Sequence, residues 1–485
     1  MAWIVLCGAA VLVAFGSVLV WRRPVLALYA FIVGLVLNNT VFLLLYKAGA
    51  HGWQLTAAQA WKEVLLAVAL GRVARDAATN RALPFRPMYV DAAAAAFALT
   101  VLVYALVPED VLGGAAGPRA VLYGLRHLLV PVAAYFVGRS LPLRRPDVER
   151  LAILTVSAAA VTAIAGIAEE YSVSVAQWHS LGANRYYTRQ LDFPTLHGPG
   201  GLPENFVFNS AEGVHRRLVS FFLSPLASAY FFVVAIPLAA AAVTAGPRRR
   251  TLVVAAAAIA FLGLLFAFTR SALVALPVGL LFVAFASRRW AVAGLVLATA
   301  AAAIGFAAVY PDVAPRTHFL ASDLAYQRHH AKVRGSLPEG HPLQTSATFS
   351  DPSEQSHLAE LRTGARSLLD HPQGYGVGNS GATAARFRVT PRAGESFYLE
   401  LGADAGVGGL ALWLLFTLLT VWGLVTVVRG RASAYVRRFA AGTLAAGVSI
   451  ALLAVISDVW GAPWLSYVLW WFSGAALTMG QRADV

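Results

Sequence analysis

Long apolar blocks separated by short polar connections dominate the pattern of this chain. A hydrocarbon core of about 30 Å needs ~20 apolar residues of helix, because backbone polar groups cannot stay unpaired in lipid. The third block contains Lys62 and Glu63, which we expect to pair or to face a cavity. The pattern predicts an all-α polytopic membrane protein with about 12–13 transmembrane helices. The candidate spans are 2–20, 24–46, 57–72, 91–107, 119–138, 149–168, 221–244, 250–268, 271–287, 290–309, 403–428, 437–456 and 460–479.

Arginines at every second junction between these blocks indicate the orientation. By the positive-inside rule, the junctions that carry them are cytoplasmic. The alternation is unbroken, and thirteen spans then place the N-terminus outside and the C-terminus inside. The arginines of this set are Arg22, Arg23, Arg72, Arg75, Arg81, Arg86, Arg139, Arg144, Arg145, Arg150, Arg248, Arg249, Arg250, Arg288, Arg289, Arg429, Arg431, Arg437 and Arg438.

This orientation makes two long polar segments extracytoplasmic, Glu169–Ser220 and Tyr310–Gly394. Both are rich in glycine, proline, histidine and arginine, and both are too long to be simple connections, so we expect them to be functional. The second should carry short helices such as Ser356–Leu369. The expected organisation is N-terminal transmembrane helices over 1–168, an extracytoplasmic loop over 169–220, transmembrane helices over 221–309, a large extracytoplasmic loop over 310–402 and C-terminal transmembrane helices over 403–485.

The composition agrees with a membrane protein. The chain is 58% hydrophobic and 13% charged, with a mean hydropathy of +0.65. Its net charge of +14 is scattered between apolar blocks and forms no basic arm, so we expect membrane lipids and no nucleic acid as partners. The first block lacks a basic n-region and a convincing small-residue cleavage site before Trp21, which favours a retained helix over a signal peptide. Cys7 is the single cysteine, which excludes an intrachain disulfide and a thiolate metal site.

Several arginines lie on the outer side, where the orientation rule does not explain them. Each one alone could reach lipid phosphates or pair with an acidic residue such as Asp458. Several on one face instead favour an anion site, because guanidinium forks match phosphate oxygens and stay charged when partly desolvated. A diphosphate at the bilayer surface is the natural ligand. The candidate diphosphate-binding residues are Arg126, Arg216, Arg217 and Arg270.

Two further motifs could carry chemistry. The stretch His371–Gly381 spells a dinucleotide fingerprint, but it follows no strand of a βαβ unit, so we interpret it as a glycine-rich turn over a site. Glu395 and Ser396 precede a short apolar helix, and the glycines of 402–409 permit a break before the next span. Ser396 could cap that helix, with Glu395 as its dipole partner. Alternatively, Glu395 is a general base at the outer surface.

The histidines of the two long segments show no metal-ligand spacing such as H-E-x-x-H. We therefore expect no metal site. These residues are His179, His197, His215, His318, His329, His330, His341, His357 and His371.

Taken together, these motifs resemble the O-antigen ligase/polymerase superfamily of membrane glycosyltransferases. Four pieces carry the resemblance in order, and W-K-E-V-L-L at Trp61–Leu66 and L-R-H-L-L at Leu125–Leu129 add to it, so that it covers about residues 55–430. The four pieces are R-L-V-S-F-F-L-S-P-L-A-S-A-Y at Arg217–Tyr230, F-T-R-S-A-L at Phe268–Leu273, an R…P-x-G-x-G region at Arg362–Gly378, and S-F-Y-L…G-A-D-A-G-V-G-G-L at Ser396–Leu410.

The resemblance implies a GT-C-type bundle in the bacterial inner membrane with its active site on the extracytoplasmic face. It implies transfer of a glycan from a polyprenyl (undecaprenyl) diphosphate carrier to a glycan or lipid acceptor, with no cofactor and no metal. Arg217 and Arg270 would bind the diphosphate, and Glu395 would accept the proton of the acceptor hydroxyl. Ligases of the superfamily tend to have His-Asn where this chain has Glu395-Ser396, which favours a polysaccharide polymerase or another acceptor.

The alternative is a transporter or flippase of lipid-linked glycans, which would also need outer arginines. A transporter should place charges near the bilayer midplane and show inverted repeats. Here the unusual residues gather on one face. An elongation-type peptidoglycan polymerase shares the fold class without a better motif match. The sugar, the acceptor and the oligomeric state stay open.

Overall fold

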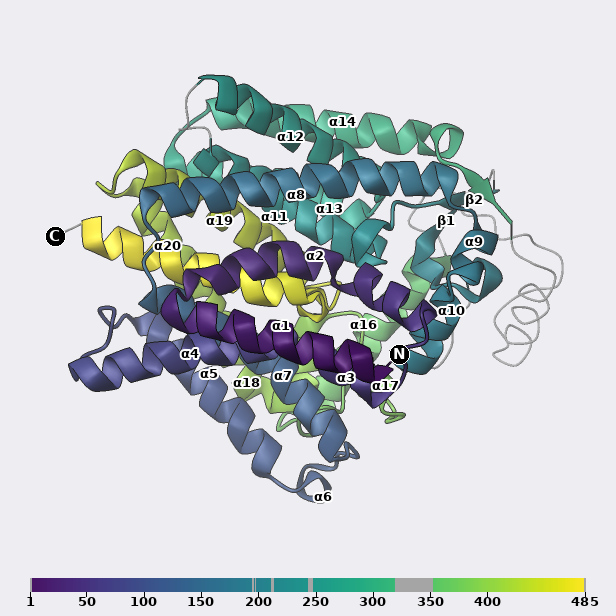
Figure 1. The fold of residues 1–485 in the computed structure, drawn as a ribbon, viewed down its shortest axis with the longest axis horizontal. Helices are drawn as coiled ribbons and strands as arrows, with labels where there is room; N and C mark the ends of the chain where they lie inside the picture. Colours follow the sequence, from purple (N-terminus) through teal and green to yellow (C-terminus); the bar gives the residue numbers. More distant parts are fainter. Residues whose placement is uncertain are drawn as a thin grey trace.

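The computed structural model describes residues 2–193, 196, 198–210, 213–242, 247–318 and 352–483, and these form a bundle of long helices (Figure 1). The all-α polytopic prediction is confirmed. Of the described helices, eleven are long and apolar enough to cross a membrane. The long helices are α1 (Ala2–Arg22), α2 (Val25–Lys47), α4 (Trp61–Asn80), α5 (Tyr89–Leu106), α7 (Pro118–Ser140), α8 (Arg145–Ser172), α11 (Pro225–Ala242), α12 (Pro247–Phe266), α13 (Arg270–Ser287), α14 (Ala291–Val313), α18 (Phe397–Arg429), α19 (Ala434–Leu453) and α20 (Trp470–Ala483).

Two of the thirteen predicted spans do not form a single helix with the predicted bounds. The predicted span 57–72 is displaced, because the short helix α3 (Trp53–Ala58) ends in a turn before the charge-bearing α4 begins. The predicted span 460–479 is split into a π-helical turn at Leu465–Leu469 and the short α20. The predicted break before the eleventh helical span is present at Gly406, where α18 is kinked at a φ of 68°.

A small three-stranded sheet connects the two long polar segments. The first segment contains the short helices α9 (Val175–Ser180) and α10 (Ala183–Arg185). The sheet was not predicted. Its antiparallel order is β1-β2-β3, and Val214 pairs with Thr317 across the last two strands. The strands are β1 (Val207–Ser210), β2 (Gly213–Arg216) and β3 (Arg316–Thr317), and the second segment adds the helices α16 (Pro352–Asp370) and α17 (Gly381–Arg386).

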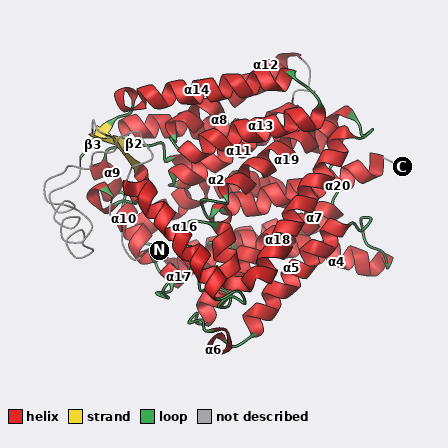
Figure 2. Cartoon of the chain, turned by 180° about the vertical axis from the view of Figure 1, so that it is seen from behind, coloured by secondary structure: helices red, strands yellow, loops and turns green. Residues whose placement is uncertain are grey.

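These polar elements lie at one end of the bundle. The strands, α9, α10 and the N-terminus lie toward the same end, and the C-terminus lies at the opposite end (Figures 1 and 2). Termini at opposite ends agree with the odd number of crossings predicted from the arginine pattern. α16 contains the predicted helix Ser356–Leu369.

Small residues allow the helices to approach closely, as is common in lipid. A β-carbon on Gly138 would lie 2.2 Å from the carbonyl oxygen of Trp471, and one on Gly474 would lie 2.3 Å from that of Tyr135. These two glycines therefore set the contact between α7 and α20. The abundance of alanine and glycine in the spans reflects this packing.

One arginine of the orientation set also anchors the fold. Arg139 is fully buried, and its guanidinium pairs with Asp91 through Nε at 2.8 Å and Nη2 at 2.9 Å. Tyr135 donates to the same carboxylate at 2.7 Å, and Arg139 also donates to Thr478. A buried pair with this many hydrogen bonds joins α5, α7 and α20, and removal of one partner would leave an uncompensated charge.

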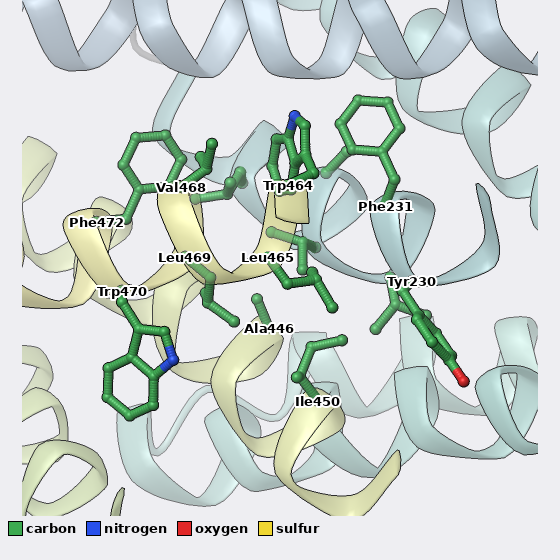
Figure 3. Close-up of a cluster of buried hydrophobic side chains, with 14 of the residues drawn as sticks. Tyr230, Phe231, Ala446, Ile450, Trp464, Leu465, Val468, Leu469, Trp470 and Phe472 are labelled. Atoms are coloured by element: carbon green, nitrogen blue, oxygen red, sulfur yellow. The ribbon is translucent and has the colours of Figure 1, made fainter. Parts of the chain in front are cut away.

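An apolar core of aromatic residues fills the centre of the bundle (Figure 3). Trp464 packs edge-on against Phe231, with ring centroids 4.7 Å apart, and its indole nitrogen donates to the carbonyl of Ile32. Tyr230 lies at the edge of this cluster, with its hydroxyl directed away from it (Figure 3). That hydroxyl donates to Ser457 at 2.7 Å. The packing of this cluster thus directs the Tyr230 hydroxyl toward the segment that follows α19.

We predict that Ser180 is accessible from outside the cell and Arg249 is not. Ser180→Cys should react with a membrane-impermeant maleimide in intact cells, whereas Arg249→Cys should react only after lysis, because the arginine-bearing junctions face the cytoplasm. Both side chains are exposed, and Cys7→Ser removes the background thiol. Labelling of Arg249→Cys alone in intact cells would reverse the orientation.

Candidate active site

Two backbone turns that each present an arginine are joined by main-chain hydrogen bonds. The first precedes α11, and the second joins α12 to α13. The Leu218 N–H donates to the carbonyl of Phe266 at 3.2 Å, which ties one turn to the other. Phe268 adopts a φ of 43°, an unfavourable conformation for a bulky residue, and stacks on Tyr310 at 3.9 Å. Such strain persists where the surrounding structure enforces it, and it is frequent at functional sites.

The side chain of Arg217 is fixed within the joined turns. Its Nε donates to the carbonyl of Ala267, Nη1 donates to that of Asn205, and Nη2 donates to the hydroxyl of Thr269 at 2.8 Å. A guanidinium has five N–H donors. Within the described part of the chain, these bonds use three, which leaves one donor on each terminal nitrogen. Burial lowers the pKa of Arg217 to about 10, with the positive charge of Arg270 adding to this effect, so Arg217 stays protonated at neutral pH.

Arg270 is the first residue of α13 and follows Thr269, to whose hydroxyl Arg217 donates. Its guanidinium lies 5.8 Å from the centroid of the Phe208 ring. The partial positive charge of a helix N-terminus disfavours a cation there and favours an anion. Two guanidinium groups within electrostatic range of each other, one of them on the first residue of an 18-residue helix, are therefore candidates for binding a multiply charged anion.

Glu395 is paired with a histidine that sequence reasoning did not connect to it. Its Oε2 lies 2.7 Å from Nδ1 of His357, which belongs to α16. Glu395 has a φ of 63° and retains a side-chain exposure of 34%, so it is held in a strained conformation at an accessible position. The hydrogen bond to Glu395 raises the pKa of His357, and the nearby positive charge of Arg270 opposes this shift.

These groups share one neighbourhood. The charge of Arg270 acts on both Arg217 and His357, and the charges of Arg217 and Glu395 both act on the hydroxyl of Tyr230. Arg217, Arg270 and Glu395 therefore lie within electrostatic range of the same groups, and their roles at a diphosphate site beside a base stay a prediction.

Arg216 is not part of this group. Its Nη2 lies 2.6 Å from Glu169, and its Nη1 donates to the carbonyl of Val173. The side chain is only 4% exposed. It pairs with an acidic residue inside the protein, which is the alternative to anion binding for an outer arginine. Successive residues of a strand point to opposite sides, which separates Arg216 at the end of β2 from Arg217.

Arg126 belongs to α7 and not to the two arginine turns. It forms an ion pair with Glu63 at 2.8 Å and lies 5.3 Å from the ring centroid of Tyr123. It lines a separate small cavity together with His127 and Asp458. Because Arg126 and Arg216 have other partners, only Arg217 and Arg270 remain as candidate diphosphate-binding residues.

The glycine-rich stretch His371–Gly381 holds α18 in place through hydrogen bonds. The N–H groups of Gly378 and Asn379 donate to Asp404 at 3.1 Å, and the Asn379 side chain donates to Glu109 at 2.6 Å. Gly378 has a φ of 96°, and a β-carbon there would lie 2.8 Å from the backbone of Ala120. The sequence interpretation as a turn over a site is thereby refined, because the contacts fix α18 and the start of α7.

The remaining motif residues have ordinary roles. Ser396 occupies the N-cap position of α18 without a side-chain cap, and its hydroxyl donates instead to the carbonyl of Ala454 at 3.4 Å. His371 stacks on Tyr375, and His215 is fully buried. His197, His329, His330 and His341 lie outside the described residues.

The fold is that of a polytopic membrane protein, with two arginines and a carboxylate as its candidate site residues. Residues 255–414 match the family model described as O-antigen ligase. This match confirms the predicted relation to the O-antigen ligase/polymerase superfamily and supports a glycosyl-transferring membrane enzyme. The matched segment includes Arg270, His357 and Glu395. No curated protein matches the chain.

Proposed function

We propose that the protein transfers a glycan from a polyprenyl-diphosphate-linked donor to an acceptor hydroxyl on the extracytoplasmic face of a bacterial inner membrane. The observation that carries this proposal is the pair of joined arginine turns beside Glu395. Arg217 and Arg270 bind the diphosphate, and Glu395 faces the acceptor. The match to the O-antigen ligase family over residues 255–414 supports the same class of substrate.

The reaction needs a nucleophile, a leaving group and a destination for one proton. The acceptor hydroxyl oxygen attacks the anomeric carbon of the donor sugar. The bond from that carbon to the diphosphate oxygen breaks, and its electron pair stays on the diphosphate. The proton of the hydroxyl passes to Glu395, and the configuration at the anomeric carbon inverts, because attack and departure occur on opposite faces. The products are a new glycosidic bond and the free polyprenyl diphosphate.

The arginines lower the barrier by stabilising charge that grows as the bond breaks. Arg217 is already fixed by Ala267, Asn205 and Thr269, so little reorganisation is needed when the diphosphate departs. Two guanidinium charges neutralise the leaving group without a metal ion. His357 holds the carboxylate of Glu395 in place through its 2.7 Å contact.

The carboxylate at position 395, where ligases of the superfamily tend to have histidine, favours a polysaccharide polymerase over transfer to lipid A-core. The protein purified in lipid nanodiscs and supplied with a polyprenyl-diphosphate oligosaccharide tests this. A polymerase lengthens the lipid-linked glycan, and a ligase moves it to another acceptor. Relocation of an unchanged donor between the leaflets of a vesicle, with no new glycosidic bond, would show a flippase and refute the proposal.

A further inference from the structure

The structure contains a small polar cavity that is lined by none of the proposed catalytic or diphosphate-binding residues. It has a volume of about 200 Å³ and is bounded by α7, α17, residues 191–193 and the turn that follows α19. It is the cavity that contains Arg126, so it accounts for one of the outer arginines that the diphosphate site leaves unused. A space of this size suits a single sugar unit.

Two guanidinium groups stack on one tyrosine in this cavity. Arg126 lies 5.3 Å from the ring centroid of Tyr123, and Arg386 lies 4.5 Å from it. Each arginine contacts a carboxylate, since Arg126 pairs with Glu63, which it shares with Lys62, and Arg386 lies 3.6 Å from Asp192. The cavity therefore has carboxylates facing its cations, which distinguishes it from the pair formed by Arg217 and Arg270. A balanced set of donors and acceptors fits a neutral, hydroxyl-rich ligand better than a diphosphate.

Aromatic side chains form much of the remaining wall. Tyr123, Phe193, Trp460 and Tyr467 all line the cavity. Aromatic faces pack against the apolar C–H faces of sugar rings. Trp460 contributes its ring to this wall, whereas its Nε1 is buried away from the cavity.

The cavity is connected to the reacting groups by short contacts. His127 and Asp458 form a pair at 3.1 Å in its wall, and Asp458 adjoins Ser457, which accepts the hydrogen bond of Tyr230. The rings of His127 and Trp460 lie 6.0 Å and 6.3 Å from that of Phe397, which begins α18 two residues after Glu395. The wall of the cavity therefore contacts the first residue of α18, which follows the carboxylate that we assign as base by two positions.

We propose that this cavity is the acceptor-sugar subsite, which binds a neutral saccharide through hydrogen bonds to Arg386 and Asp192 and through packing on its aromatic rings. The proposal rests on the proposed function for its orientation toward Glu395, but saccharide binding itself can be measured without any turnover. It gives Arg126 the role of holding the Tyr123 ring and does not make it a diphosphate ligand.

Saturation-transfer difference NMR on the full-length protein in nanodiscs tests the proposal. The probes are glucose, galactose, mannose, rhamnose and N-acetylglucosamine, each as the free sugar. At least one should give signals in the wild type. Arg386→Ala should weaken that binding about tenfold, and Asp192→Asn, which keeps the size of the side chain and removes its charge, about three- to tenfold. Arg388→Gln is the matched control, because Arg388 is an exposed arginine of the same segment outside the cavity.

Binding of geranylgeranyl diphosphate, measured in parallel, separates the two sites. It should be weakened by Arg217→Ala and unchanged in Arg386→Ala, whereas sugar binding should behave in the opposite way. Absence of a signal from every sugar with the wild type, or equal signals in Arg386→Ala and Arg388→Gln, overturns the acceptor subsite. Displacement of the sugar by geranylgeranyl diphosphate in the Arg217→Ala background also overturns it, in favour of a second anion site. Unchanged diphosphate binding in Arg217→Ala would instead refute the donor site and leave the sugar result standing.

Discussion

Replacing either Arg217 or Arg270 by alanine should lower the rate of glycan transfer by about 10²–10³-fold at saturating donor. Each variant loses a fixed positive charge that acts on the departing diphosphate, and stabilisation of that kind is realised mainly in the transition state. Arg217→Lys and Arg270→Lys should recover only part of the rate, because an ammonium lacks the planar fork that contacts two oxygens. The measurement is transfer from a polyprenyl-diphosphate oligosaccharide by purified protein.

A matched control is needed because Arg217 also supports the joined turns. Arg119→Ala removes another outer arginine, exposed at the start of α7 and outside the proposed site, and should keep its full rate. Thermal unfolding should separate a local loss of charge from a loss of fold. Wild-type turnover in Arg217→Ala and Arg270→Ala would remove the argument for a diphosphate site.

The transmembrane fold could be predicted from the sequence because its signal is strong. Each span needs ~20 apolar residues, so the long apolar blocks that form α2 and α8 are easily recognised in the sequence. The two spans that were misplaced are those in which the signal weakens. Lys62 and Glu63 place charges in the first turn of α4, and the π-helical turn at Leu465–Leu469 divides the last span. The sheet was missed because strands of four and two residues carry no readable alternation.

The candidate site could be predicted only in part. The charge pattern identified Arg217, Arg270 and Glu395, since cations on the outer side and an acid before a helix are unusual. It could not separate Arg216 from Arg217, because adjacent arginines look alike until the strand places them on opposite sides. It could not connect His357 to Glu395, because the two residues lie in different elements with no motif between them. It also could not show that Glu63 pairs with Arg126.

The largest expected effect belongs to Glu395. Glu395→Gln should retain the donor but lower turnover by about 10²–10⁴-fold, the usual range for loss of a general base. The amide keeps the size of the side chain and cannot accept the proton. If Glu395 only favoured the N-terminus of α18, the change would cost less than ~1 kcal/mol of stability and little rate. Turnover near that of the wild type at saturating donor would therefore refute the assignment of the base.

The pH dependence of thermal unfolding tests whether Glu395 acts as a general base or only forms a structural pair with His357. The hydrogen bond to Glu395 raises the pKa of His357, so the stability that the pair contributes is fully present below the ordinary histidine pKa of about 6.5. It is lost as the pH rises through the raised value. Glu395→Gln and His357→Gln should both abolish this part of the pH dependence of thermal unfolding. His357→Gln should nevertheless keep much of the turnover, because it removes the residue that positions the carboxylate and leaves the carboxylate itself. Equal loss of turnover in both variants would instead make His357 the proton acceptor, with Glu395 as the group that orients it.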